Sequence, residues 1–188
     1  MDSNYLSSIV KQFSYYKMLG DKTFVQLSDE QLFWQYHPDS NSIAIIVQHL
    51  WGNMLSRWTD FLTTDGEKES RRRDAEFEPD LQTRAELLEK WEAGWACLFQ
   101  ALQTITPNDW GREVYIRNQA HSITDAINRQ LAHYAYHVGQ IVWIGKMLCA
   151  DNWVSLSIPK GKSGTFNAEK FAQSKHKAHF TDEFLSKP

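Results

Sequence analysis

The sequence has only two cysteines, no excess of basic residues and no long apolar run, and each absence excludes a class of protein. Cys97 and Cys149 lie far apart and outside any C-x-x-C arrangement, which argues against a disulfide framework and for a reducing compartment. Lys and Arg total 20 against 23 Asp and Glu, and no basic stripe alternates with aromatic residues. A nucleic-acid partner is therefore not expected.

Membrane insertion and export are not expected either. The longest purely apolar run, Ile43 to Val47, is far shorter than the roughly 20 residues of a membrane-spanning helix. The first residues carry neither the basic segment nor the apolar core of a signal peptide. We therefore expect a cytoplasmic protein with no membrane partner.

What the sequence does contain is enough apolar material for one folded unit. Of its 188 residues, 42% are hydrophobic and 13% are aromatic, which suits a domain that buries roughly 70% of its unfolded surface. We expect residues 1–188 to form a single domain, with residues 173–188 as a polar and loosely ordered tail. The eight tryptophans are assigned to core packing and to a subunit interface.

Four segments place apolar residues at the spacing of three to four that is typical of amphipathic helices. They run from Ser3 to Leu27 with a candidate break at Gly20, from after Ser42 through Phe61 to a stop at Asp65-Gly66, between Pro79-Asp80 and Thr106-Pro107, and from Ser122-x-x-Asp125 to about Ala150. Nothing predicts a sheet. Such spacing suits an all-α four-helix bundle, and the long connections indicate at least one crossover between helices.

The chain beyond Asp151 loses this periodicity and is expected to form a short irregular extension. Residues 153–158 look extended, and residues 167–172 are expected to form one capped turn.

The most informative stretch, His133-Tyr-Ala-Tyr-His137, lies inside the last of these helices. At about 100° per residue, positions i and i+4 project from the same side one turn apart, as two ligands of one metal ion require. His49 takes a similar place at the flank of the apolar stripe of the second helix. If the two helices are neighbours, the three imidazoles leave a coordination position open, which is the pattern of catalytic metal sites. The alternative is three partly buried histidines, each with one hydrogen-bond partner.

Several polar residues accompany the histidines. Asn53, Gln130 and Gln140 lie one turn from a histidine, so they are candidates to orient an imidazole or to bind substrate. Arg57 and Arg129 could clamp a substrate carboxylate, but ion pairs with neighbouring acids on the bundle surface are the favoured interpretation.

Two further features of the sequence have alternative interpretations. Arg71-Arg72-Arg73 is closely followed by acidic residues, which favours a solvated loop over an anion site. His121, at the start of the last helix, is a candidate proton donor or acceptor near the metal. No carboxylate pair stands at helical spacing beside the histidines.

Longer blocks around the histidines add a resemblance. These blocks are residues 41–50, 53–58, 65–68 and 73–77 around His49, and residues 126–141 around the histidine pair. They resemble a bacterial family of uncharacterised proteins in the DinB/YfiT-like superfamily, and the similarity extends from the first helix to about Phe171. The resemblance implies a four-helix bundle, commonly dimeric, with a divalent metal on one histidine of the second helix and an H-x-x-x-H pair of the fourth. In this sequence those ligands are His49, His133 and His137.

The same superfamily includes thiol-dependent enzymes, among them bacillithiol transferases and mycothiol-dependent maleylpyruvate isomerases. The resemblance therefore implies a homodimer that acts on a small-molecule substrate, with a low-molecular-weight thiol as the candidate. A cation that deprotonates a thiol yields a nucleophile at neutral pH, which is the chemistry of a metal-dependent thiol S-transferase.

The alternatives are a metal-dependent hydrolase and a non-catalytic metal-binding module. A purely structural ion usually has a fourth ligand, which Cys97 or Cys149 could supply in principle. Zinc or nickel suits three imidazoles best, with iron or manganese as alternatives.

Overall fold

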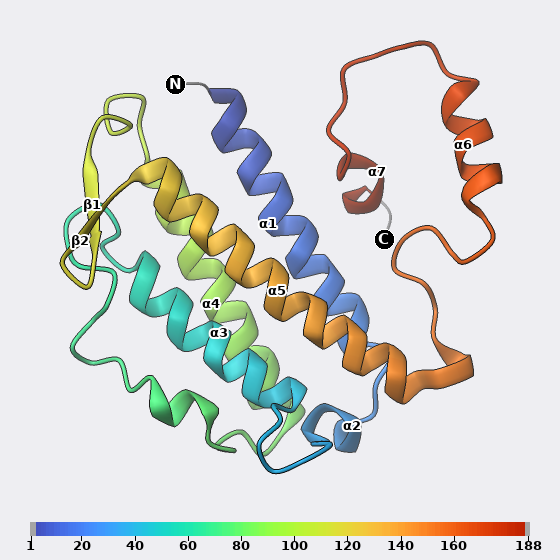
Figure 1. Ribbon diagram of the computed structural model, residues 1–188, viewed down its shortest axis with the longest axis horizontal. Coiled ribbons are helices and arrows are strands. Elements are labelled where there is room, and N and C mark those ends of the chain that lie inside the picture. Colours follow the sequence, from blue (N-terminus) through green and yellow to red (C-terminus); the bar gives the residue numbers. More distant parts are fainter. Residues whose placement is uncertain (1–2, 187–188) are drawn as a thin grey trace.

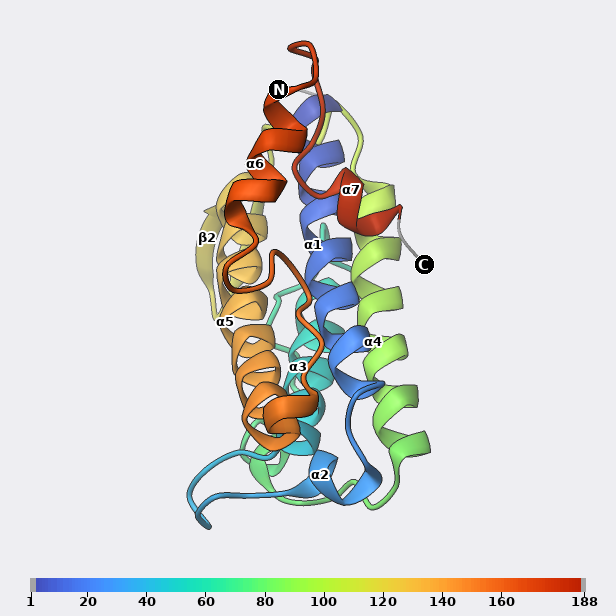
Figure 2. The ribbon, with the colours of Figure 1, turned by 90° about the vertical axis from the view of Figure 1, so that its right-hand side faces the viewer.

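Four long helices lie side by side along the molecule in the computed structural model, which describes residues 3–186 (Figure 1 and Figure 2). They are α1 (Ser3–Phe24), α3 (Ile43–Trp58), α4 (Arg84–Thr104) and α5 (Ile123–Cys149). The shorter elements are α2 (Asp29–Phe33), the 3-10 helix η1 (Asp74–Phe77), β1 (Glu113–Ile116), β2 (Gln119–Ser122), the 3-10 helix η2 (Ala150–Asn152), α6 (Ser163–Phe171) and α7 (Asp182–Leu185). The prediction of a mainly helical chain is broadly confirmed.

Each long helix contacts two others, so that α1, α5, α3 and α4 follow one another around a common core. The directions of α3 and α4 follow from two contacts. The ammonium of Lys90 lies 4.3 Å from the centre of the Trp51 ring, and the Cys97 thiol lies 3.6 Å from the hydroxyl of Thr59. The two helices therefore run in the same direction, and the connection between them, residues 59–83, must return along the length of α3 (Figure 1).

Aromatic side chains fill the centre of the core. Phe13, Trp58, Trp95 and Tyr134 are all at most 2% exposed, and their rings meet edge to face or at a tilt. The buried Tyr134 hydroxyl accepts a hydrogen bond from Trp58 Nε1 at 2.9 Å and donates one to Asn53 Oδ1 at 3.0 Å, so it remains paired away from water.

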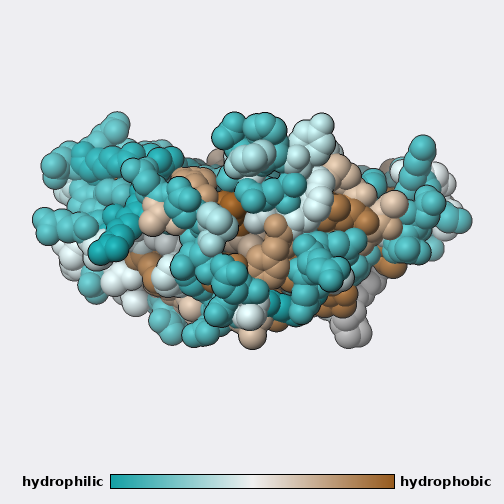
Figure 3. Space-filling model, turned by 90° about the horizontal axis from the view of Figure 1, so that it is seen from below, coloured by the Kyte–Doolittle hydropathy of each residue, from teal (hydrophilic) through white to brown (hydrophobic). Residues whose placement is uncertain are grey.

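The outer surface differs from this core in its polarity. The face seen in Figure 3 is mostly hydrophilic, with separate small apolar areas. Within residues 3–186, none of the helices combines the length and the apolar character needed to cross a membrane.

Two helices differ from their predicted bounds. The helix expected to reach Phe61 ends at Trp58, because Thr59 has an extended backbone with ψ 124° and Asp60 a positive φ of 50°, and neither conformation continues a right-handed helix. Conversely, α1 continues through Gly20 without a break. The glycine is needed for packing, since a Cβ atom there would lie 2.4 Å from the ring of Trp91.

The prediction that the chain contains no sheet was wrong. Strands β1 and β2 pair antiparallel around Arg117 and Asn118, which both have positive φ, the geometry of a two-residue hairpin turn. The sequence signal is weak, because each strand has four residues and the turn lacks the usual glycine. Tertiary contacts compensate: Val114 and Ile116 are buried, and the Asp65 carboxylate accepts hydrogen bonds from both turn N–H groups.

The segment after α5 is irregular apart from short helices. Residues 153–158, which were expected to be extended, belong to no helix or strand, and α6 is longer than the single turn expected at residues 167–172. Within the predicted loose tail, residues 173–188, Asp182 of α7 forms a 2.6 Å ion pair with Lys11 of α1. Residues 187–188 of that tail lie outside the described residues.

Candidate metal centre

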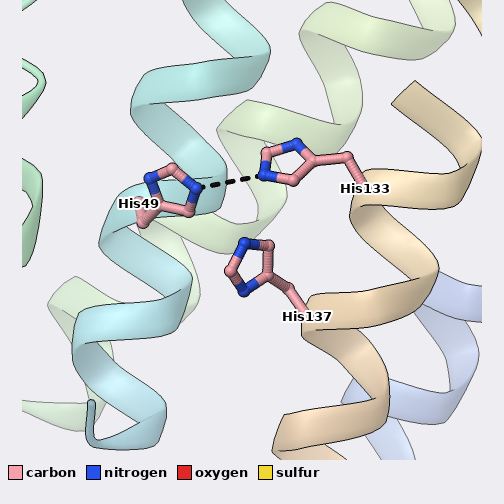
Figure 4. Close-up of side chains that lie close together, drawn as sticks. All are labelled: His49, His133 and His137. Atoms are coloured by element: carbon pink, nitrogen blue, oxygen red, sulfur yellow. Dashed lines mark hydrogen bonds between the residues drawn. The ribbon is translucent and has the colours of Figure 1, made fainter. Parts of the chain in front are cut away.

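Three histidine side chains converge between α3 and α5 and point toward one another (Figure 4). His49 comes from α3, and His133 and His137 come from successive turns of α5. One potential ligand atom from each residue lies within 4.8 Å of the others, and the Nε2 atoms of His49 and His133 are 3.2 Å apart. Two nitrogen ligands of a tetrahedral zinc ion lie about 3.3 Å apart. The three predicted residues are therefore close enough to hold a metal ion.

The positions of these histidines follow from how their helices begin and pack. Ser42 and Ser122 cap α3 and α5, each accepting a hydrogen bond from a backbone N–H in the first turn. His49 and His137 lie beside the fully buried core stripes, with 5% and 8% of their surface exposed. Because α3 and α5 are direct neighbours, the flanks that carry the histidines meet.

The crossover between α3 and α4 covers His49. Glu76 of η1 places Oε2 2.8 Å from His49 Nδ1, and the Phe77 ring stacks on the imidazole with 4.7 Å between ring centres. The carboxylate accepts the Nδ1 proton, so the Nε2 lone pair is directed at the other histidines. A Cβ at Gly52 of α3 would lie 2.5 Å from Glu76 Oε1, so the glycine makes room for this carboxylate.

Glu76 was not identified as a site residue from the sequence. The prediction covered acids at helical spacing beside the histidines, whereas Glu76 reaches the site from η1, in the connection between α3 and α4. Two features of the sequence point to Glu76. It lies within residues 73–77, one of the blocks that carry the family resemblance, and Gly52 lies one turn after His49.

The three predicted amides have different surroundings. Gln140 Oε1 lies 2.9 Å from His137 Nδ1 and accepts its proton, the arrangement expected of a residue that orients an imidazole. Asn53 instead bonds to the core hydroxyl of Tyr134. Gln130 lies on the wall of the site, and its buried Oε1 has no hydrogen-bond partner within the described part of the chain.

Neither cysteine closes the site. The potential ligand cluster that contains the three histidines includes no thiol among the described residues. Cys97 is half-buried near Thr59, and the thiol of the buried Cys149 bonds to the carbonyl of Gln26 at 3.3 Å. Both thiols are free. The candidate site therefore has three protein ligands, the number that leaves one coordination position open in a tetrahedral site.

A cavity of about 380 Å³ opens over the histidines. Besides these three, its lining residues are five arginines and three other side chains, namely Arg57, Arg71, Arg73, Arg117, Arg129, Asn53, Phe77 and Gln130. A larger cavity of about 630 Å³ is lined in part by Arg71 and Glu76 and has none of the three histidines on its wall. The chemistry of the candidate site is therefore in the smaller cavity.

Two of these arginines are buried, contrary to the predicted surface ion pairs and solvated loop. The side chains of Arg57 and Arg71 are only 6% and 4% exposed. Glu76 binds Arg71 through both oxygens at 2.7 and 2.8 Å, and Glu67 contacts Arg57 and Arg117 at 3.0 and 3.1 Å. The predicted pairing of Arg57 with an acid is correct, since Arg57 binds Glu67, but its predicted place on the surface is wrong. The crossover folds back onto α3 and encloses the side chains of Arg57 and Arg71.

The remaining arginines are exposed. Arg129 forms no ion pair with an acid of the described residues; its guanidinium instead donates to Nε2 of His121 at 2.9 Å. His121, a candidate proton donor or acceptor near the metal, does not line the cavity. Its hydrogen bond to Arg129 connects it to a residue that does line the cavity.

Burial makes the imidazoles of His133 and His137 poor bases. It lowers the pKa of His133 to about 3, and the neighbouring imidazole of His137 and the guanidinium charges of Arg57 and Arg71 act in the same direction. Burial and His49 likewise lower the pKa of His137 to about 4, although its bond to Gln140 acts in the opposite direction. Both side chains are neutral at pH 7, the form that ligates a metal.

Comparison with known proteins adds a family. A family model described as "Protein of unknown function (DUF1572)" matches residues 1–162. No curated protein and no solved structure matches the chain. The matched region contains the three histidines, Glu76 and all five cavity arginines, and it ends one residue before α6. Because the match covers most of the sequence, the chain belongs to the DUF1572 family of proteins of unknown function.

Proposed function

We propose that this protein is a metal-dependent thiol S-transferase with one divalent ion on His49, His133 and His137. The observation that carries the proposal is the convergence of three imidazoles within 4.8 Å at an open cavity. Three protein ligands beside an open space are typical of catalytic metal sites. Zinc or nickel is the proposed ion, with iron or manganese as alternatives, since three imidazoles suit all four.

We also propose that the fold is a DinB/YfiT-like four-helix bundle. The cyclic order of α1, α5, α3 and α4 and the placement of the ligands on α3 and α5 support this assignment. A free cysteine pair supports a cytoplasmic location.

The choice of a thiol over water rests on the wall of the cavity. No carboxylate is found among its described lining residues, and the carboxylate that contacts a histidine, Glu76, is already bound to His49 and Arg71. A hydrolase of this kind commonly uses a free carboxylate as general base for water. A divalent cation supplies Lewis acidity that favours the thiolate form of a thiol, whose ordinary pKa is about 8.5, without such a base.

The residues of the chain then have defined tasks. Glu76 and Gln140 hold two imidazoles by their Nδ1 atoms, and Phe77 packs against His49 to limit the access of water. The thiol proton leaves to solvent, the sulfur forms a bond to an electrophilic carbon of the second substrate, and the displaced group departs with its electron pair.

The metal is tested by elemental analysis of tag-free protein after reconstitution with zinc or nickel. About one ion per chain is expected in the native protein and none in His133→Ala/His137→Ala. The control variant His37→Ala/His176→Ala removes two exposed histidines and should retain the ion. Native protein that holds no ion after reconstitution would refute the metal site.

The reaction is tested with 1-chloro-2,4-dinitrobenzene as electrophile and glutathione, cysteine or 2-mercaptoethanol as thiol. Thiol-dependent turnover that disappears in His133→Ala/His137→Ala is the expected result. Cleavage of p-nitrophenyl acetate without a thiol would instead support the hydrolase. Absence of both activities, together with metal-dependent thermal stability, would support a non-catalytic module.

A homodimer is proposed from an exposed apolar stripe on α5. Tyr136, Trp143 and Met147 recur at helical spacing and are 64%, 65% and 40% exposed. Large apolar side chains that line up on one helix face are typical of interaction surfaces. The second copy is expected to cover this stripe.

A further inference from the structure

We infer that a substrate of this site carries a carboxylate or phosphate group, and that Arg73, Arg117 and Arg129 bind it at the mouth of the cavity. This inference rests on one part of the proposed function, namely that substrate binds in the cavity over the histidines. Carboxylate and phosphate groups are both oxyanions, and the proposed ligand is a small molecule that carries one of them.

The charge balance around the cavity supports this inference. Five arginines line it, and in the described part of the chain only two carboxylates, Glu67 and Glu76, form ion pairs with any of them. The formal excess is three positive charges around a space of about 380 Å³. Like charges gathered at a concave, partly dry surface repel one another, and a bound anion removes that repulsion.

The arginines divide into two groups by burial. Arg57 and Arg71 are buried and directed by their bonds to Glu67 and Glu76, so they form part of the wall. Arg73, Arg117 and Arg129 are exposed. The second group is therefore accessible to a ligand that enters from solvent.

The three exposed arginines come from segments far apart in the sequence. Arg73 precedes η1, Arg117 is in the hairpin turn and Arg129 is on α5. Each has a neighbour that restrains it: Arg73 lies 5.5 Å from the centre of the Phe77 ring, Arg117 pairs with Glu67, and Arg129 bonds to His121.

Restraint of this kind matters because the guanidinium binds through a planar fork. Two parallel N–H donors match the oxygens of a carboxylate or a phosphate, and pre-positioned forks lose less entropy on binding. The three arginines come from separate segments and line the same cavity as the histidines. This arrangement suits the binding of one ligand by several guanidinium groups better than it suits unrelated surface residues.

The test measures anion binding by isothermal titration calorimetry, with the full chain both free of metal and loaded with zinc. The probes are inorganic phosphate and succinate, with succinamide as the neutral counterpart of succinate. The test variant is Arg73→Ala/Arg117→Ala/Arg129→Ala. The charge-matched control, Arg72→Ala/Lys160→Ala/Lys177→Ala, removes three exposed cations outside the cavity lining. Circular dichroism verifies that both variants are folded, and Arg129→Ala alone serves if the triple variant is not.

We expect saturable binding of phosphate or succinate, no binding of succinamide, and a loss of about tenfold or more in the test variant. Arg129→Ala alone should weaken binding about threefold or more, and the control should stay within about twofold. The probe that binds more tightly identifies the group as phosphate or carboxylate.

The metal-free arm separates this inference from the proposed metal chemistry. Anion binding that depends on the three arginines in metal-free protein supports the inference, even if the protein fails to retain zinc. The inference would be overturned if zinc-loaded protein bound neither phosphate nor succinate. It would also be overturned if the test and control variants lost anion affinity equally. Neither result would contradict the metal site.

Discussion

Replacement of Glu76 by Gln is the most direct test of how the crossover supports the histidines. The carboxylate makes one 2.8 Å bond to His49 Nδ1 and two bonds, of 2.7 and 2.8 Å, to Arg71. The amide of Gln is nearly isosteric, but it has one acceptor oxygen and directs N–H donors at groups that are themselves donors. At least one charge-assisted bond is lost.

Two magnitudes follow from these contacts. Loss of the charge-assisted bond, with Arg71 still buried, should lower the free energy of unfolding of the metal-free protein by about 2 to 4 kcal/mol. Loss of the carboxylate that orients a metal-binding imidazole should weaken metal binding about 10- to 100-fold, or about 1.4 to 2.7 kcal/mol. Urea denaturation measures the first quantity, and competition for zinc with a chromophoric chelator measures the second.

Glu67→Gln is the matched control, because Glu67 binds the same arginine network but no histidine. It should reduce stability while leaving zinc affinity within about threefold of the native value. If Glu76→Gln binds zinc within about twofold of the native protein, the carboxylate does not orient His49 and the reasoning is refuted.

Three further outcomes are expected. Tyr134→Phe removes a buried hydroxyl with two hydrogen bonds and should cost about 1 to 3 kcal/mol in urea denaturation; a cost below about 0.5 kcal/mol would contradict the assigned network. Trp143→Glu should convert the proposed dimer to a monomer in light scattering, whereas Val25→Glu, at another exposed apolar residue, should not; a native monomer would refute the interface. In metal-free protein, the free energy of unfolding should fall as the pH is lowered from about 6.5 toward 4, because the unfolded chain takes up protons that His133 and His137, with pKa values of about 3 and 4, do not accept when folded. Urea denaturation should show this fall flattened in His133→Ala/His137→Ala, and equal slopes would show that other groups cause it.

Errors at the level of secondary structure arose where local signals are short. The period of 3.6 is visible over the 27 residues of α5 but not over the four-residue strands of the hairpin. The end of α3 at Trp58 depends on the non-helical backbone of Thr59 and Asp60, while the apolar pattern itself continues to the buried Phe61. Phe61 is buried although it lies outside the helix, so its apolar side chain extended the helical pattern past the actual end of α3.

The sequence by itself determined the long helices and the faces that carry His49, His133 and His137, because helix caps and helical spacing act between residues close in the chain. Only the tertiary structure decided what surrounds them. The path of residues 59–83 has no periodicity, yet it brings Glu76 to His49 and buries Arg71. Such placements depend on contacts between distant segments, and those contacts exist only once the helices have packed.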